Sequence, residues 1–234
     1  MNLQPYIDNG RFLCIMEYKG VDIKWLHHNC FRISGSGQVV YTDPYKVVNR
    51  YADANTVLIT HDHYDHLDVE SLKKVVKDDT TLVAPRDCKD RLGQFKNKKL
   101  FVSPNEIKIV DGVTIKTVPS YNVNKFRTKT EVFHPKDKGN VGYIFIVSGV
   151  RFYIGGDTDF IPEMNDYRTD VALIPISGIY VMTAEEAAKA AMAIKADLTI
   201  PAHYGAGIGT AADAKRFVGL LKGKLKTAIL ESSD

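Results

Sequence analysis

A cluster of metal-binding residue types lies within six positions of this 234-residue chain: His61, His63, Asp65 and His66. The cluster directly follows residues 56–60, an apolar run of the kind found in a buried strand. Side chains at positions i and i+2 of an extended segment point the same way, so His61 and His63 can aim at one point. Because α/β folds place their sites where buried strands end, we interpret the cluster as a functional site rather than a solvated loop.

The chemistry of the cluster is that of a metal site. Imidazole and carboxylate groups are the usual protein ligands of Zn²⁺, Fe and Mn. His66 comes where the chain turns into an expected helix, so it can aim at a second point beside the first. One loop could therefore serve two adjacent cations, as two-metal hydrolysis requires.

Three further residues follow strand-like runs; two of them could complete two metal sites, and the third could support a ligand. Asp157 comes after two glycines that permit close backbone approach, so its carboxylate could bridge two cations, with Asp159 as the competitor for that role. His203 ends another such run and is expected to be a ligand. Asp43 is expected to accept a proton from a ligand imidazole.

Short strand-like runs dominate the chain. We expect strands at residues 11–18, 21–25, 30–33, 39–41, 56–60, 81–84, 100–102, 107–110, 113–118, 143–147, 150–154, 171–176, 198–201 and 226–230. Helices are expected at residues 69–77, 183–195 and 210–221, the first capped by Asp68 and the second opened by a capping box. Meanders mixed with strand–helix–strand units indicate two packed sheets with outer helices, in a single domain over residues 1–234.

Composition narrows the classes of protein. Thirty-one basic against 28 acidic residues give a net charge of +3, too slight for binding driven by phosphate neutralisation, so we expect no nucleic-acid partner. The sequence has no uninterrupted apolar stretch of about 18 residues, so we expect no membrane span. The first residues do not resemble a secretory signal. The odd, widely spaced Cys14, Cys30 and Cys88 fit a reducing cytoplasm.

Taken together, these residues resemble the metallo-β-lactamase superfamily of metal-dependent hydrolases. The resemblance runs from about residue 25 to residue 230, and residues 61–66 are similar to the signature of the superfamily. Asp43 matches its first motif, Asp157 its bridging aspartate and His203 its last ligand.

Residues 25–31 point to one branch within that superfamily. Their sequence, Trp-Leu-His-His-Asn-Cys-Phe, is similar to the W-L-G-H-A-x-F opening of the branch containing the L-ascorbate-6-phosphate lactonase-like proteins. His27 replaces the glycine of that opening and His28 takes the position of its histidine. Residues 156–160 and 183–187 also resemble this branch.

The resemblance implies an α+β fold, a four-layer αββα sandwich with metals at the rim where strand-end loops converge. The implied ligands are His61 and His63 at site one, Asp65, His66 and His203 at site two, and Asp157 between the sites. Two divalent ions are implied, zinc first, and the thiolate-free ligand set leaves Mn²⁺ or Fe open.

One ligand of the superfamily is missing from its usual place. A third site-one histidine usually follows the strand that corresponds here to residues 113–118, but this chain continues Pro-Ser-Tyr-Asn. We expect the loop at residues 120–140 to fold back so that His134 fills the place. The alternatives are a water-filled position or an oxygen from Asn122.

Such a centre predicts a hydrolase, because metal binding lowers the pKa of water from 15.7 to about 7. Asp65 could orient the resulting hydroxide. His28 and Tyr204 are candidates for protonating the leaving group; each could instead be structural, His28 as a buried hydrogen-bond partner and Tyr204 in packing.

The expected substrate is a small ester, lactone or phosphoester, and a nuclease acting on RNA or DNA is the alternative. The loop at residues 124–138 carries five cations, Lys125, Arg127, Lys129, Lys136 and Lys138. They could meet an anionic group of the substrate, or they could simply be solvated.

Overall fold

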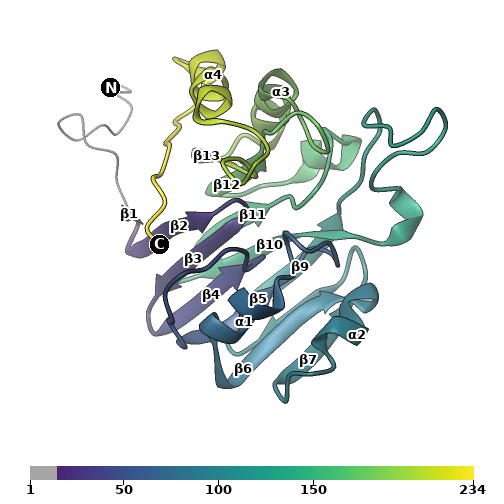
Figure 1. Cartoon of the computed structure of the whole chain (residues 1–234). Coiled ribbons are helices and arrows are strands. Elements are labelled where there is room, and N and C mark those ends of the chain that lie inside the picture. The colour runs from purple at the N-terminus through teal and green to yellow at the C-terminus, as the bar shows by residue number, and fades with distance from the viewer. Residues whose placement is uncertain (1–14) are drawn as a thin grey trace.

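The computed structural model describes residues 15–234, which form two mixed β-sheets packed face to face with helices outside them (Figure 1). The first sheet has the strand order β1-β2-β3-β4-β5-β6-β7, antiparallel up to β4 and parallel from β4 onward. Its strands are β1 (Met16–Tyr18), β2 (Val21–His27), β3 (Cys30–Gly35), β4 (Gln38–Thr42), β5 (Ala54–Leu58), β6 (Val76–Pro85) and β7 (Lys98–Val102).

The second sheet has the order β13-β12-β11-β10-β9-β8 and mirrors this plan. Its strands β8 to β11 are antiparallel and β11 to β13 are parallel. The strands are β8 (Ile107–Val110), β9 (Val113–Pro119), β10 (Val141–Val147), β11 (Val150–Ile154), β12 (Val171–Pro175) and β13 (Leu198–Ala202). The expected hairpin between β10 and β11 is confirmed; Ser148 and Gly149 both have positive φ, as its tight turn requires.

Helices cover the outer face of each sheet (Figure 1). On the first sheet lie α1 (Val69–Val75) and the short α2 (Lys89–Leu92); on the second lie α3 (Ala184–Ile194) and α4 (Ala211–Leu221). Asp68 caps α1, and capping boxes open α3 and α4 at Thr183 and Thr210. Four layers result, which confirms the αββα sandwich.

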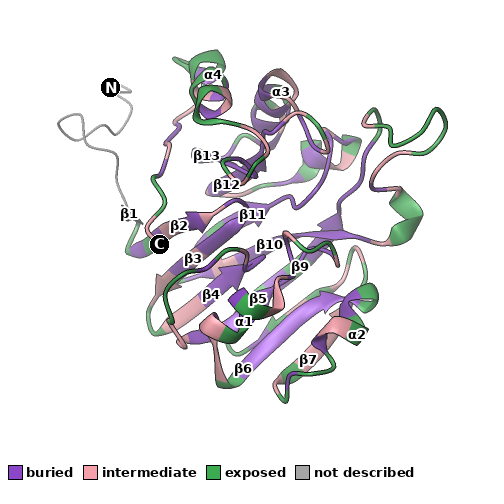
Figure 2. Cartoon of the chain, in the orientation of Figure 1, coloured by how far each residue is buried: buried purple, intermediate pink, exposed green. Residues whose placement is uncertain are grey.

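The main core lies between the sheets. Strand alternation supplies it: β2 and β9 bury every second residue over most of their length. Figure 2 shows the central strands mainly buried and the exposed residues mostly on loops and helices. Ile23 and Phe31 of the first sheet and Ile115 and Phe145 of the second belong to one buried cluster. Burial of each such side chain stabilises the folded state by about 1.5–3 kcal/mol. The core therefore holds the two sheets, and the loops at their strand ends, in a fixed position relative to each other.

Two sequence expectations are corrected. The strand expected at residues 226–230 is wrong: the chain meets the edge of β13 only through the isolated bridge between Thr199 and Thr227. It then leaves toward the other sheet, where the Ser233 amide donates to the Trp25 carbonyl. The helix expected over residues 69–77 ends at Val75, where β6 begins directly.

Part of the first expected strand cannot be compared with the structure. Of the strand expected at residues 11–18, positions 11–14 lie outside the described residues, as does Cys14.

The two described cysteines, Cys30 and Cys88, are buried free thiols. Within residues 15–234, every helix is too short or too polar to cross a bilayer.

Candidate metal centre

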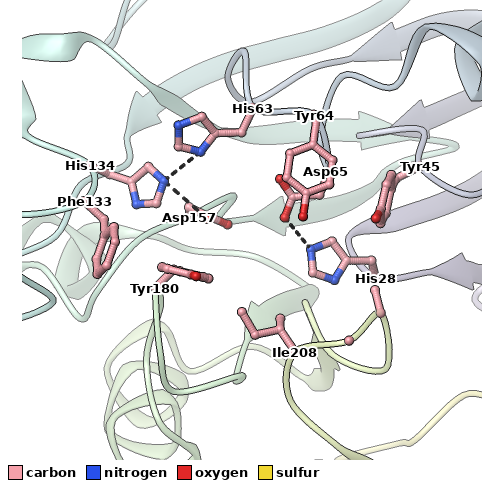
Figure 3. A pocket seen from close by; sticks show the side chains of 12 residues that line it. His28, Tyr45, His63, Tyr64, Asp65, Phe133, His134, Asp157, Tyr180 and Ile208 are labelled. Carbon is pink, nitrogen blue, oxygen red and sulfur yellow. Dashed lines mark hydrogen bonds and ion pairs between the residues drawn. The ribbon is translucent and has the colours of Figure 1, made fainter. Parts of the chain in front are cut away.

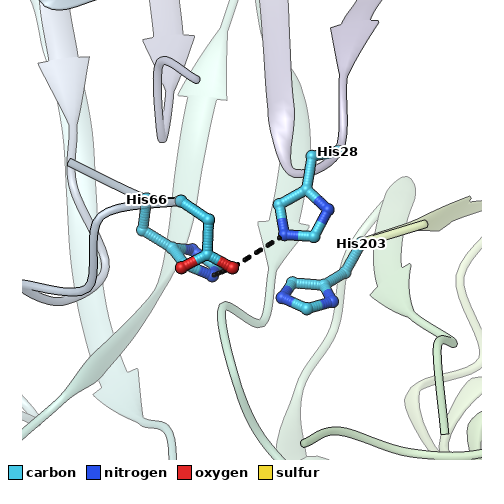
Figure 4. Close-up of side chains that lie close together, drawn as sticks. His28, His66 and His203 are labelled. Carbon is cyan, nitrogen blue, oxygen red and sulfur yellow. Dashed lines mark hydrogen bonds and ion pairs between the residues drawn. The ribbon is translucent and has the colours of Figure 1, made fainter. Parts of the chain in front are cut away.

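Two groups of four side chains meet at one rim of the sandwich, where strand ends of both sheets come together. Within each group the potential ligand atoms all lie within 4.8 Å of one another. The first group is His61, His63, His134 and Asp157; the second is His28, Asp65, His66 and His203 (Figures 3 and 4). The structure therefore brings together every residue that the sequence named as a metal ligand.

Asp157 lies between the two groups. Its Oδ1 is 3.0 Å from Nε2 of His66 and 2.8 Å from Nε2 of His203, both in the second group. Its Oδ2 is 3.4 Å from Nε2 of His134 in the first group. One carboxylate oxygen thus faces each group, which is the arrangement of a bridging ligand. Asp159 lies outside both groups, and its Oδ2 accepts from the backbone amides of Val123 and Asn124.

Backbone geometry explains how Asp157 reaches this position. It follows β11 through Gly155 and Gly156, and Gly156 has φ +61. A Cβ on Gly156 would lie 2.7 Å from Cβ of Thr60, closer than side chains pack. The glycine therefore lets the Asp157 loop approach the loop that carries the histidine cluster.

Asp43, which follows β4, ties the histidine loop in place. Its carboxylate accepts from the backbone amide and hydroxyl of Thr60, both at 2.8 Å, and from the Asn29 amide at 2.6 Å. It also lies 2.7 Å from Nδ1 of His66. The expected role of Asp43 as partner of a ligand imidazole agrees with this geometry, because the contact directs Nε2 of His66 toward Asp157.

Similar contacts orient His203 and His134. Nδ1 of His203 lies 2.9 Å from the Ser177 hydroxyl. The Asn122 side-chain oxygen lies 2.9 Å from the His134 amide and 2.8 Å from its Nδ1. The loop after β9 does fold back, and Nε2 of His134 comes within 3.2 Å of Nδ1 of His63 (Figure 3). Asn122 therefore holds His134 and does not itself belong to the first group.

Buried polar atoms at the centre lack hydrogen-bond partners. Within the described part of the chain these include Nε2 of His61, His66 and His203 and Oδ1 of Asp157; the close approaches of Oδ1 to His66 and His203 are not hydrogen bonds. A buried polar atom without a partner costs about 1–3 kcal/mol. Four such atoms converging on two points fit the donor set of bound cations, because coordination would satisfy them together.

The electrostatics of the metal-free centre favour the neutral forms of His61 and His134, the charged form of His66 and an anionic Asp157. Burial lowers the pKa of His134 to about 4, and burial with the neighbouring His66 holds that of His61 well below its usual value. Burial opposes the charge on Asp157, but His203 and His66 outweigh it and keep the pKa of that carboxyl well below its usual range. Asp157 and Asp43 likewise raise the pKa of His66 despite burial.

His28 was expected to be a proton donor or a buried hydrogen-bond partner, and the structure places it within the second group. It sits at the tip of the β2–β3 turn with φ +53, and its Nε2 is 3.3 Å from Oδ2 of Asp65 (Figure 3). Its ring centroid is 3.8 Å from that of His203. Burial lowers the pKa of His28 to about 3, so it is neutral at physiological pH and has no imidazolium proton to give. Its position in the opening motif was the only sequence signal for a role at the metals.

Tyr204 packs instead of facing the centre. Its buried ring stacks on Trp25 with centroids 4.7 Å apart, and burial raises its pKa. Among the described residues it is not part of the lining of the cavity over the metal groups. The geometry agrees with the packing alternative for Tyr204.

A cavity of about 480 Å³ opens over the two groups (Figure 3). The basic loop contributes to its wall only Phe133 and His134. Three of the loop's five cations pair with carboxylates elsewhere: Lys125 with Glu186, Lys136 with Glu163 and Lys138 with Asp87. Of the two alternatives for the basic loop, the geometry agrees with cations that lie away from the centre, because none of them is in the described lining.

Comparison with known proteins agrees with this geometry. Residues 22–203 match the family described as Beta-lactamase superfamily domain. A UPF0173 metal-dependent hydrolase of Pyrococcus furiosus is 31% identical over 230 residues, covering 92% of this chain and 98% of that protein.

Two solved structures extend the likeness to the fold. A metal-dependent hydrolase from Parabacteroides distasonis has a TM-score of 0.79 and 29% identity, covering 94% of this chain and 100% of that one. A Zn-dependent hydrolase of the metallo-β-lactamase superfamily from Thermotoga maritima has a TM-score of 0.60 and 22% identity, covering 89% of this chain and 97% of that one. The chain belongs to the UPF0173 family of metal-dependent hydrolases in the metallo-β-lactamase superfamily.

Proposed function

We propose that the chain is a two-metal hydrolase of a small ester, lactone or phosphoester. The observation that carries this proposal is the position of Asp157, which directs one carboxylate oxygen to each of two groups of imidazoles and carboxylates. Each group gathers at least three nitrogen or oxygen donors, the number that catalytic zinc sites use.

Each residue has a defined part in this proposal. His61, His63 and His134 would hold the first cation, His28, Asp65, His66 and His203 would hold the second, and Asp157 would contribute to both. Bound there, divalent cations would ionise water near neutral pH and polarise the substrate oxygen. Asp65, whose pKa falls to about 2 because its contacts with His28 and His66 outweigh burial, stays anionic and can orient the nucleophile. Asp43, Asn122 and Ser177 fix the imidazole rings.

The donor sets support zinc in the first site, where three imidazoles and one carboxylate match its usual coordination. With Asp157 shared, the second group offers five nitrogen and oxygen donors, a set that also suits Mn²⁺ or Fe.

Residues 25–31 resemble the opening motif of the L-ascorbate-6-phosphate lactonase-like branch, which supports a place for this chain in that branch of the superfamily. The nuclease alternative has less support, because the described lining of the cavity holds no Lys or Arg to contact a phosphate backbone.

Metal stoichiometry tests the proposal. We expect two divalent ions per chain in the purified protein, measured by inductively coupled plasma mass spectrometry, and fewer than one in Asp157→Asn, with hydrolysis of model esters and lactones lost. Asp62→Asn is the matched control, since Asp62 lies in the same loop outside both groups. Two ions retained by Asp157→Asn would contradict the bridging role.

A further inference from the structure

The cavity above the metal centre is lined by aromatic and apolar side chains to which the proposed function assigns no role. Five of its twelve lining side chains are large and mainly apolar: Tyr45, Tyr64, Phe133, Tyr180 and Ile208. Its ionisable groups, tyrosines aside, all belong to the two metal groups, and in residues 15–234 the lining holds no Lys or Arg. Anything bound here beyond the metals therefore meets rings, not charges.

The rings form two opposed walls (Figure 3). On one side Tyr45 and Tyr64 meet edge to face, with centroids 5.9 Å apart, and Tyr45 also contacts the His28 ring. On the other side Phe133 and Tyr180 meet edge to face at 4.7 Å. Each wall joins two loops that are distant in sequence, and Asp157 lines the same cavity as both walls.

These rings are open to the cavity. Tyr64 is 69% exposed, and its phenol has no hydrogen-bond partner among the described residues. Phe133 and Tyr180 are half-buried. Covering such aromatic faces with an apolar group of a ligand removes water from both surfaces, which lowers the free energy of binding. Small-molecule pockets are usually lined in this way.

In residues 15–234, the lining of the cavity holds no Lys or Arg to pair with an anionic tail on the substrate. Lys46 lies over the ring of Tyr45 with Nζ 5.4 Å from its centroid, but it does not line the cavity. Lys125 and Lys136 are held by Glu186 and Glu163. A cationic tail would meet like charge, since two bound dications exceed the charge of Asp65 and Asp157.

We propose that this pocket selects substrates whose part remote from the reacting bond is uncharged and aromatic or alkyl, held between the Tyr45–Tyr64 wall and the Phe133–Tyr180 wall. The substrate class is then an ester or lactone with an apolar tail, in place of the anionic substrate that the basic loop suggested. This inference rests on the proposed function, because the metals fix the reacting end.

Binding of matched hydroxamates to the metal-loaded protein tests it without requiring turnover. Acetohydroxamate reports the metals alone, and 3-phenylpropanohydroxamate adds an aromatic tail. Succinic monohydroxamate and a trimethylammonium-tailed hydroxamate add charged tails. By isothermal titration calorimetry we expect the phenyl compound to bind about tenfold tighter than acetohydroxamate, from the apolar area it buries, and both charged compounds to gain nothing.

Variants locate the effect. Phe133→Ala and, independently, Tyr180→Ala should each remove most of the phenyl gain and leave acetohydroxamate binding unchanged. Phe126→Ala is the control, because Phe126 lies on the same loop, is 53% exposed and does not line the cavity. Circular dichroism checks that each variant is folded.

The outcomes separate the two proposals. Absence of bound metal together with no acetohydroxamate binding would contradict the proposed function. Acetohydroxamate binding without a phenyl gain, a larger gain from either charged tail, or an unchanged phenyl gain in both wall variants would overturn the inference about the tail alone.

Discussion

At the scale of single residues, the centre depends on imidazole and carboxylate groups, which histidine and aspartate side chains supply. The spacing of strand-end His and Asp residues predicted that they would come together, and they do. Asp157, which the sequence favoured over Asp159 for the bridging role, is the residue whose two oxygens face the two groups. The sequence did not assign His28 to the second group, since nothing in the local sequence says that the β2–β3 turn reaches across to His203. That contact depends on the His203 amide donating to the His28 carbonyl, a tertiary bond.

Gly156→Ala is expected to destabilise the protein more than Gly149→Ala. Both glycines have positive φ, which costs an alanine about 1–2 kcal/mol. Only at Gly156 does the new Cβ meet Thr60, whereas nothing lies within 4 Å at Gly149. Overpacking should add about 1–3 kcal/mol to the loss at Gly156, measured by urea unfolding. Equal losses for the two variants would show that close approach to Thr60 is unimportant.

The metal-free protein should lose stability as the pH falls from about 6.5 to about 4. Burial lowers the pKa values of His134 to about 4 and of His28 to about 3, so in this window the unfolded chain binds the protons that the folded chain refuses. Each such histidine lowers the free energy of unfolding by about 1.4 kcal/mol per pH unit. The raised pKa of His66 adds no slope here, because its stabilisation is fully present below the unfolded value.

Urea unfolding of chelator-treated protein at pH 7, 6 and 5 measures this slope. His134→Gln removes one of the titrating groups and should make the slope shallower. A free energy of unfolding that stays level over this range would mean that these histidines are not held neutral by burial.

At the scale of elements, strands were predictable and the long loop was not. Alternation of buried and exposed residues marks β2 and β9, and capping residues mark where α3 and α4 begin. The expected strand at residues 226–230 failed because an apolar run cannot show that the chain will leave the sheet edge. The return of the loop after β9 was inferred from a missing ligand, and the bonds that fix it, from Asn122 to His134, are invisible to local patterns.

His134→Ala should reduce the metal content from two ions per chain toward one. Its Nε2 lies 3.2 Å from Nδ1 of His63 and 3.4 Å from Oδ2 of Asp157, so its loss leaves the first group one donor short. Mass spectrometry of metals gives the count. His27→Ala, a histidine outside both groups, is the control. Full two-metal occupancy in His134→Ala would remove His134 from the ligands.

At the scale of the whole molecule, each of the two groups of candidate ligands takes side chains from both sheets of the sandwich. His61 and His66 follow β5 of the first sheet, whereas Asp157 and His203 follow β11 and β13 of the second. Neither sheet holds a complete group by itself. Metal binding should therefore stabilise the packing of one sheet on the other, and not just one loop.

Removal of metal should accordingly lower the melting temperature of the entire domain in one transition. A ligand present at about 1,000 times its dissociation constant stabilises the folded state by about 4 kcal/mol, so the shift should be several degrees or more. Calorimetry with and without a chelator measures it, and re-addition of Zn²⁺ or Mn²⁺ should restore the transition. A melting temperature that ignores the chelator would disagree with a centre shared between the sheets.

Anomalous scattering from a crystal of the metal-loaded protein would show where the metals lie relative to Asp157. We expect two anomalous peaks, one beside each oxygen of Asp157, with His134 at the first and His28 at the second. A single peak, or peaks remote from Asp157, would contradict this expectation.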